Sequence, residues 1–269
     1  MHSDISGPAG RLHVDDGGTG GVAVVFVHAF AGSSTHWTEQ VEHIRRDRRA
    51  IALDLRGHGR SDAIAGEDVS IEDLAADIAA VAAALRLERF VLVGHSIGGA
   101  AAIALAGEAP ERVAGLLLVG TPGRVPIEQA DQIVSAMTSD YDETMSGYWD
   151  RLLADATPKV KDQIEAEREH MPQDAAIALI RATFAYDPLP ALQDYAGPTL
   201  AVTSSDGPND LHNQVAGLPH EQISGTSHWV HMDRPAEFNR ILDAFLARVD
   251  ETEAGSRRSP AGRATATAR

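Results

Sequence analysis

A serine flanked by two nearby glycines stands where a strongly apolar segment ends. The pentapeptide Gly94-His95-Ser96-Ile97-Gly98 has the form G-x-S-x-G, and residues 90–93 before it (FVLV) are typical of a buried strand. The small residues from Ala100 to Ala109 then favour a helix that can lie close to a sheet. A tight strand-to-helix turn of this kind excludes bulky neighbours and exposes the serine hydroxyl. We therefore predict that Ser96 is a nucleophile.

Serine is a weak nucleophile and needs a general base that a third group orients. His228 is the expected base, because it lies on a loop of small residues before a final helix that we predict from Pro235 to Val249. His231 follows three residues later and would suit a metal pair, but no carboxylate-rich helix accompanies it. We therefore expect no metal site.

The orienting acid is expected in the loop after a predicted strand, Thr199 to Thr203. Asp206 and Asp210 both stand in this loop. We favour Asp206, because it lies nearer the end of the strand, where the backbone is best fixed. Asp210 is the alternative, and in its other role it would cap the short helix that follows.

Backbone amides that could stabilise an oxyanion come from two places. The chain turns sharply after Val27, so the N–H of Phe30 is expected to point towards Ser96. Together with the N–H of Ile97 it would form an oxyanion hole, whereas the Phe30 side chain would line the pocket.

Short apolar runs at residues 22–27, 50–53, 90–93, 116–119 and 199–203 must position these groups. Helix-like segments separate several of them, such as Ile71 to Leu85, whose apolar residues recur at helical spacing. This alternation predicts an α/β fold with a mostly parallel central sheet and helices on both faces. The G-x-G-x-x-A spacing of residues 18–23 precedes a strand instead of following one, so we predict no dinucleotide cofactor.

The alternation stops after residue 123. Residues 124–196 read as wholly helical, and we interpret them as a helical cap or lid inserted between two parts of an α/β core, residues 1–123 and 197–250. Residues 251–269 contain four arginines, two glutamates and almost no large apolar side chains, so we expect a disordered tail.

Composition limits the classes of partner. The chain of 269 residues has a formal net charge of −16, which disfavours binding to nucleic acid or to anionic lipid. It contains no cysteine, no apolar run long enough for a membrane span and no signal-peptide pattern at its beginning. We expect a cytoplasmic protein that works without a membrane, while its oligomeric state stays open.

Four segments together resemble the α/β-hydrolase fold superfamily: VFVHAFAGSS, LDLRGHGRSD, VLVGHSIGG and GTSHWVHMDRP, in that order. The resemblance implies the chain order Ser, Asp, His for the catalytic residues. It also implies that RGHGRSD forms a structured turn near the site, so His58, and likewise His95, are expected to be structural. Serine in place of aspartate at position 96 argues against the dehalogenase and epoxide-hydrolase branches.

The leading functional hypothesis is a serine hydrolase of the esterase or lactonase kind. It would cleave an ester or lactone of a small, largely apolar molecule through an acyl-enzyme and would need no cofactor. Residues 124–196 carry 14 acidic and 6 basic side chains, a net of −8, which disfavours polyanionic substrates such as CoA thioesters. Two alternatives stay open: a non-hydrolytic or carbon–carbon-cleaving enzyme of this fold (cofactor-independent oxygenase, perhydrolase or C–C bond hydrolase), and a ligand-binding receptor without turnover.

Overall fold

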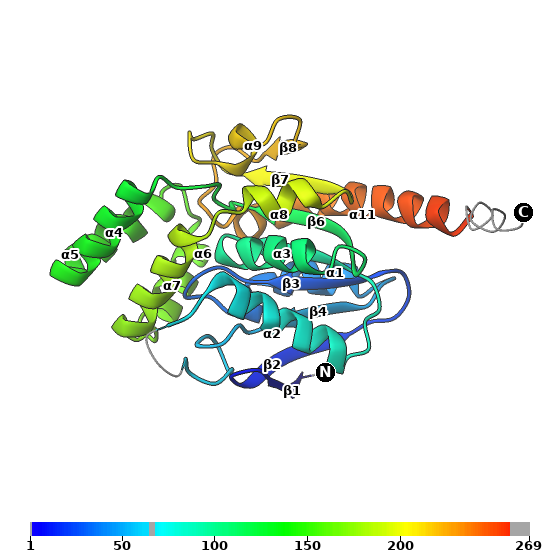
Figure 1. The fold of residues 1–269 in the computed structure, drawn as a ribbon, viewed down its shortest axis with the longest axis horizontal. Coiled ribbons are helices and arrows are strands. Elements are labelled where there is room, and N and C mark those ends of the chain that lie inside the picture. Colours follow the sequence, from blue (N-terminus) through cyan, green and yellow to red (C-terminus); the bar gives the residue numbers. More distant parts are fainter. Residues whose placement is uncertain (1, 65–67, 259–269) are drawn as a thin grey trace, which may run out of the picture.

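An eight-stranded sheet forms the centre of the computed structural model, which describes residues 2–64 and 68–258 (Figure 1). The strand order is β1-β2-β4-β3-β5-β6-β7-β8. The pairs β1–β2 and β2–β4 are antiparallel, and the other neighbouring strands are parallel. The strands are β1 (His2–Gly7), β2 (Gly10–Gly17), β3 (Ala23–Val27), β4 (Ala50–Leu53), β5 (Phe90–His95), β6 (Val113–Val119), β7 (Thr199–Thr203) and β8 (His220–Gln222).

Helices cover both faces of this sheet. Alternate residues of β3 belong to different apolar clusters: Val25 packs with residues of α2 and α3, and Phe26 packs with residues of α1 and α11. Such alternation is expected of a strand that is buried on both sides. The predicted fold class is therefore confirmed. The helices outside residues 124–188 are η1 (Ser34–Trp37), α1 (Thr38–Ile44), α2 (Ile71–Ala84), α3 (Ile97–Glu108), α8 (Leu189–Asp194), α9 (Leu211–Gln214), α10 (Val230–Asp233) and α11 (Pro235–Arg258).

The segment between β6 and β7 is helical, as its sequence predicts. It contains α4 (Ile127–Ser139), α5 (Tyr141–Leu152), α6 (Pro158–Arg168), α7 (Gln173–Ala185) and α8. Figure 1 shows α4 and α5 projecting from one end of the sheet, whereas α8 lies against α3 beside the sheet. The last helix of the segment is thus part of the layer that covers the sheet.

The C-terminal helix is longer than predicted. The predicted tail begins at residue 251, but α11 continues to Arg258. Two ion pairs hold this extension: Asp250 pairs with Arg48, and Glu253 pairs with Arg89 at 2.6 Å. Residues 259–269 lie outside the described part of the chain. Within that part, no helix combines the length and the hydropathy that a membrane span requires.

Candidate active site

Ser96 occupies the sharp turn between β5 and α3. Its backbone has φ 53° and ψ −117°, a conformation that residues with a side chain rarely adopt. The turn is held from both sides, because the Ser96 N–H donates to the Val119 carbonyl at 2.9 Å and the Ser96 carbonyl accepts from the Gly99 and Ala100 amides. The serine therefore stands at the N-terminus of α3, where the helix dipole favours negative charge.

The glycines on either side of Ser96 are required by close packing. A Cβ atom on Gly94 would lie 2.6 Å from the Gly98 carbonyl oxygen, and one on Gly98 would lie 2.5 Å from the His28 carbonyl oxygen. The second contact also brings the loop after β3 against the serine turn.

Both residues predicted to form the oxyanion hole line the same cavity as Ser96. Ile97 is the first residue of α3, so its amide has no acceptor within the helix. Phe30 lies on the loop after β3 that packs on Gly98, and its ring stacks on Trp149 of α5 with centroids 5.8 Å apart. The side chain of Phe30 is thus part of the cavity wall, as expected.

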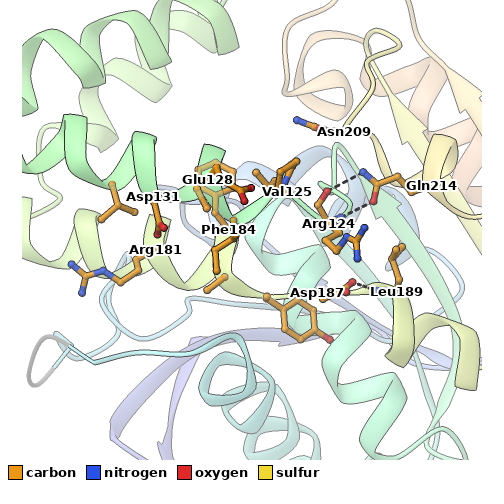
Figure 2. A pocket seen from close by; sticks show the side chains of 16 residues that line it. Arg124, Val125, Glu128, Asp131, Arg181, Phe184, Asp187, Leu189, Asn209 and Gln214 are labelled. Carbon is orange, nitrogen blue, oxygen red and sulfur yellow. Dashed lines mark hydrogen bonds between the residues drawn. The ribbon is translucent and has the colours of Figure 1, made fainter.

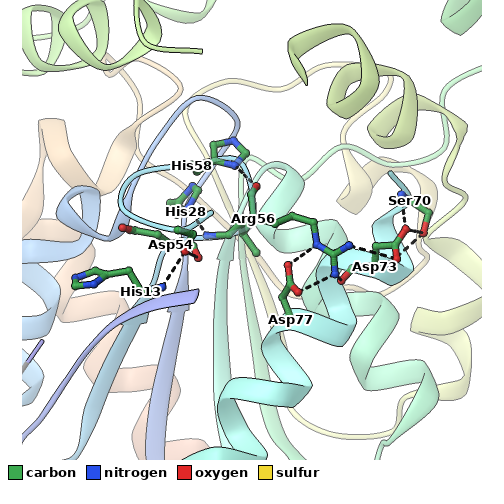
Figure 3. Close-up of polar contacts among 10 residues, drawn as sticks. His13, His28, Asp54, Arg56, His58, Ser70, Asp73 and Asp77 are labelled. Carbon is green, nitrogen blue, oxygen red and sulfur yellow. Dashed lines mark hydrogen bonds and ion pairs between the residues drawn. The ribbon is translucent and has the colours of Figure 1, made fainter. Parts of the chain in front are cut away.

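Two buried histidines fix the loop after β3. His28 Nδ1 donates to the Ala29 carbonyl at 2.7 Å, and its Nε2 accepts from the Leu55 amide at 3.0 Å, so both nitrogens of the neutral ring are used (Figure 3). His58 lies with its ring centroid 4.9 Å from that of His28 and donates from Nδ1 to the Arg56 carbonyl. Burial lowers the pKa of His58 to about 3. These contacts give His58 the structural role that the sequence suggests.

Buried carboxylates also hold the loops after β3 and β4 (Figure 3). Asp54 accepts from the Ser34 amide at 2.6 Å and from the Arg60 amide at 2.8 Å, which joins the loops after β3 and β4. Asp77 on α2 binds the Arg56 guanidinium through two hydrogen bonds of 2.7 Å each. A bidentate pair of this kind is geometrically specific, so it holds the turn near the site in one orientation.

His228, the predicted base, lines the same cavity as Ser96. Its ring lies against Gly120, where a Cβ would come within 2.7 Å of the His228 Cε1 atom. Its backbone amide donates to the Leu152 carbonyl at the end of α5 at 3.0 Å. Burial lowers the pKa of His228 to about 4, so the ring is neutral at neutral pH, as a general base must be.

The ring of His95 packs against the ring of His228 and against that of His231. The His95 ring centroid is 4.5 Å from that of His228 and 5.0 Å from that of His231, and both rings are fully buried. Burial lowers the pKa of each well below its usual range. Both therefore act as neutral packing groups, which agrees with the structural role expected for His95.

Asp233 is a site residue that the sequence reasoning missed. Its Oδ2 accepts from the Ser227 amide at 2.9 Å and from the Ser227 hydroxyl at 2.5 Å, and its Oδ1 accepts from the Thr157 amide at 2.8 Å. This buried carboxylate ties the His228 loop to the residue before α6. The available signal was a serine and an aspartate on either side of His228, within seven residues.

The structure does not bring Asp206 to the cavity, contrary to our preference for it as the orienting acid. The Asp206 side chain is 64% exposed and bonds to Asn213 Nδ2 at 2.5 Å and to His212 Nε2 at 3.1 Å. Asp210, the alternative, lines the cavity with Ser96 and His228 and accepts from the Gly207 amide at 2.7 Å. The Asp206 side chain is directed towards its polar partners His212 and Asn213. The sequence alone does not reveal these contacts.

Asp206, Asp210 and His212 also offer side-chain ligand atoms within 4.8 Å of one another. Such a set could hold a cation. However, the hydrogen bonds from His212, Asn213 and the Gly207 amide already explain why these groups gather, so they make a polar network that orders the loop.

The cavity that unites these groups has a volume of about 1150 Å³. Its floor comes from the loops at the carboxyl ends of the sheet strands, and its walls include Tyr148 and Leu152 of α5 and Ile180 and Phe184 of α7. A cavity of this size accommodates a small organic molecule. Ser96 and His228 line it together with Phe30 and Ile97.

A family model described as alpha/beta hydrolase fold matches residues 22–167, more than half of the chain. The chain belongs to the α/β-hydrolase fold family. It is thus an enzyme of the hydrolase superfamily, and the resemblance noted in its four motifs is confirmed.

Relatives from several organisms share this fold. A putative carbamate hydrolase RutD from Variovorax paradoxus is 29% identical over 93% of this chain and 97% of its own length. A 40% identical match to the dihydrolipoyllysine-residue acetyltransferase component of an acetoin-cleaving system from Pseudomonas putida covers 40% of this chain and 29% of that protein.

Two solved structures are similar over most of the chain. A thermophilic esterase from Thermogutta terrifontis has a TM-score of 0.79 and 25% identity, covering 93% of this chain and 99% of the esterase. Est816, described as an N-acyl homoserine lactone degrading enzyme, has a TM-score of 0.75 and 27% identity, covering 90% of this chain and 100% of that protein.

Proposed function

We propose that the protein is a serine hydrolase that cleaves a carboxylic ester or lactone of a small, largely apolar substrate. The observation that carries this proposal is the meeting of the strained Ser96 and the neutral His228 in one cavity. An ester or a lactone presents a carbonyl carbon that an activated serine can attack. The esterase and the lactone-degrading enzyme among the similar structures support this substrate class.

The reaction follows from the positions of these groups. His228 takes the proton of the Ser96 hydroxyl as the oxygen attacks the carbonyl carbon, and the amides of Phe30 and Ile97 donate to the oxyanion. The tetrahedral intermediate collapses as His228 returns the proton to the leaving alcohol. Water then attacks the acyl-enzyme by the same steps, which releases the acid and restores Ser96. This cycle uses no cofactor.

The imidazolium that forms on His228 needs a carboxylate partner. We propose Asp210 for this role instead of Asp206, because Asp210 lines the cavity with His228 and Asp206 is bound to His212 and Asn213. The backbone supports the choice: Asp210 forms a β-bridge with Pro122, two residues after the Gly120 that the His228 ring touches.

The helices α4 to α7 would act as a cap over this site. Residues of α4, α5 and α7 line the cavity together with Ser96 and His228. The acidic excess of residues 124–196 makes a neutral substrate more suitable than a polyanion. The cytoplasmic location and the absence of nucleic-acid partners stay predictions from composition.

The variant Ser96→Ala tests the nucleophile. It removes only the hydroxyl oxygen, so the protein should fold normally and lose at least about 10³-fold in kcat on p-nitrophenyl acetate and butyrate. The measurement is the initial rate of p-nitrophenol release, with circular dichroism as the check of folding. Equal rates for the two proteins would rule out Ser96, and so would a fluorophosphonate probe that fails to label the folded wild type.

A further inference from the structure

A second cavity of about 930 Å³ lies beside the catalytic one, between α4, α7 and the loop after β6. Its apolar wall is formed by Val125, Ile127, Val134, Phe184 and Leu189. We call this space the α4–α7 groove. Figure 2 shows Phe184 in the middle of the groove, with Arg181 and Asp131 at one end and Arg124 beside Gln214 at the other.

The groove adjoins the catalytic cavity. Val125, Phe184 and Asn209 line both spaces, so they form the boundary between them. Phe184 is only partly buried, which is expected of a side chain that has open space on two sides. A chain attached to a carbonyl at Ser96 would enter the groove past Phe184.

The rim of the groove exposes apolar surface without a partner. Ile127 is 70% exposed and is the one large hydrophobic side chain of that exposure in the described residues. Ile127 also lines the groove, so its exposed side chain adds apolar surface to the groove's rim. Between the charged ends of the groove, Glu128 lies beside the apolar Val125 and Phe184 (Figure 2).

We propose that the α4–α7 groove binds the distal part of an extended acyl chain whose carbonyl lies at Ser96. This inference rests on the proposed function, and it narrows the substrate class to esters or lactones with a medium or long apolar chain. We infer an apolar occupant because two of the three residues that line both spaces, Val125 and Phe184, are apolar. Each methylene group moved from water into such a groove strengthens binding roughly fourfold.

A matched pair of variants on α4 tests the groove. Val134 lines it, whereas the next residue, Ser135, is exposed and lines neither cavity. Val134→Trp fills the groove, and Ser135→Trp adds the same side chain to the outer face of the helix. The measurement is kcat/KM on p-nitrophenyl acetate, butyrate, octanoate and decanoate.

We expect Val134→Trp to lower the ratio of kcat/KM for decanoate to kcat/KM for acetate at least tenfold, and Ser135→Trp to leave this ratio unchanged. Ile127→Glu, at an exposed position where folding is not at risk, should lower the same ratio several-fold. An unchanged ratio in both groove variants, with acetate still hydrolysed, would overturn the groove and leave the proposed function intact.

Binding of methyl ketones separates the two proposals. Decan-2-one carries a carbonyl and a chain but no cleavable ester, so calorimetry reports its affinity for wild type and for Ser96→Ala alike. We expect decan-2-one to bind more tightly than hexan-2-one, and Val134→Trp to remove that difference. This result without any ester hydrolysis would keep the groove and reject the serine hydrolase. Equal affinities for the two ketones in the wild type would reject the groove.

Discussion

Burial of imidazole rings sets the acid–base chemistry of the site at the level of single residues. His228 has a pKa of about 4 and His58 one of about 3, and burial is the largest cause in both. Near pH 7 these rings are neutral, so Ser96 meets a base that is ready to accept a proton. The charge that forms on His228 during turnover lies on a half-buried ring, where a carboxylate partner would stabilise it.

The same change, from carboxylate to amide, distinguishes the two candidate acids Asp206 and Asp210. Asp210→Asn should lower kcat on p-nitrophenyl butyrate by up to about 10⁴-fold, because an amide cannot stabilise the imidazolium. Asp206→Asn should cost less than tenfold, since Asp206 is exposed and bonds to groups outside the cavity. Steady-state kinetics of the two purified variants gives the answer. A larger loss in Asp206→Asn would return the role to Asp206.

The sequence predicts single residues well where their position depends on neighbours along the chain. Ser96 is of this kind, because the G-x-S-x-G spacing, the strand before it and the helix after it lie within twenty residues. The direction of the Asp206 side chain, in contrast, depends on contacts that the spacing of residues does not predict. It depends on hydrogen bonds to Asn213 and His212 of α9, and the sequence does not reveal which side chains turn towards each other.

At the level of elements, the loops of the site hold one another through buried contacts. Gly98 lets the serine turn pack on the His28 carbonyl, and Asp54 joins the loops after β3 and β4. Asp233 joins the His228 loop to the start of α6. The catalytic geometry therefore depends on buried polar bonds between elements that are distant in sequence.

Asp233→Asn tests this dependence. Asparagine has one acceptor oxygen where aspartate has two, so it cannot accept all three hydrogen bonds. A buried donor then loses its partner, which lowers the unfolding free energy by about 1–3 kcal/mol. We also expect kcat to fall more than tenfold with little change in KM, because His228 is displaced while the cavity stays open. Urea unfolding and steady-state kinetics measure the two effects.

Asp243→Asn is the matched control for that change. Asp243 is an exposed acid on α11 that bonds to His43 at 2.8 Å, and a surface pair of this kind contributes at most about 1 kcal/mol. It should leave kcat unchanged. Equal kinetics in Asp233→Asn and Asp243→Asn would show that Asp233 does not position the base.

Elements were predictable where their residues are buried on both sides. The five apolar runs became β3, β4, β5, β6 and β7, because continuous burial leaves a continuous apolar signal. The hairpin of β1 and β2 was missed, since its first strand is exposed or half-buried throughout and its second carries polar residues. The extension of α11 was missed because ion pairs to distant arginines, and no apolar stripe, hold it.

For the whole molecule, buried neutral histidines make stability depend on pH. His95 and His231 have fully buried rings and a pKa well below the usual 6.5. As the pH falls below 6.5, these histidines take up protons in the unfolded chain but not in the folded one, so the unfolding free energy decreases. The net charge of −16 also diminishes on acidification, which acts in the opposite direction by reducing self-repulsion.

His231→Phe separates the two effects, because it removes one buried titrating ring and changes the overall charge very little. The ring stacks on Trp37 at 4.0 Å and lies 5.7 Å from Phe238, so a phenyl ring can take its place among aromatic neighbours. Relative to wild type, the variant should gain unfolding free energy as the pH falls from 6.5 to 5, by at most about 1.4 kcal/mol for each pH unit. Urea titrations at half-unit steps over this interval measure the difference. Parallel curves for the two proteins would mean that His231 takes up its proton equally in the folded state, which would contradict its burial as a neutral ring.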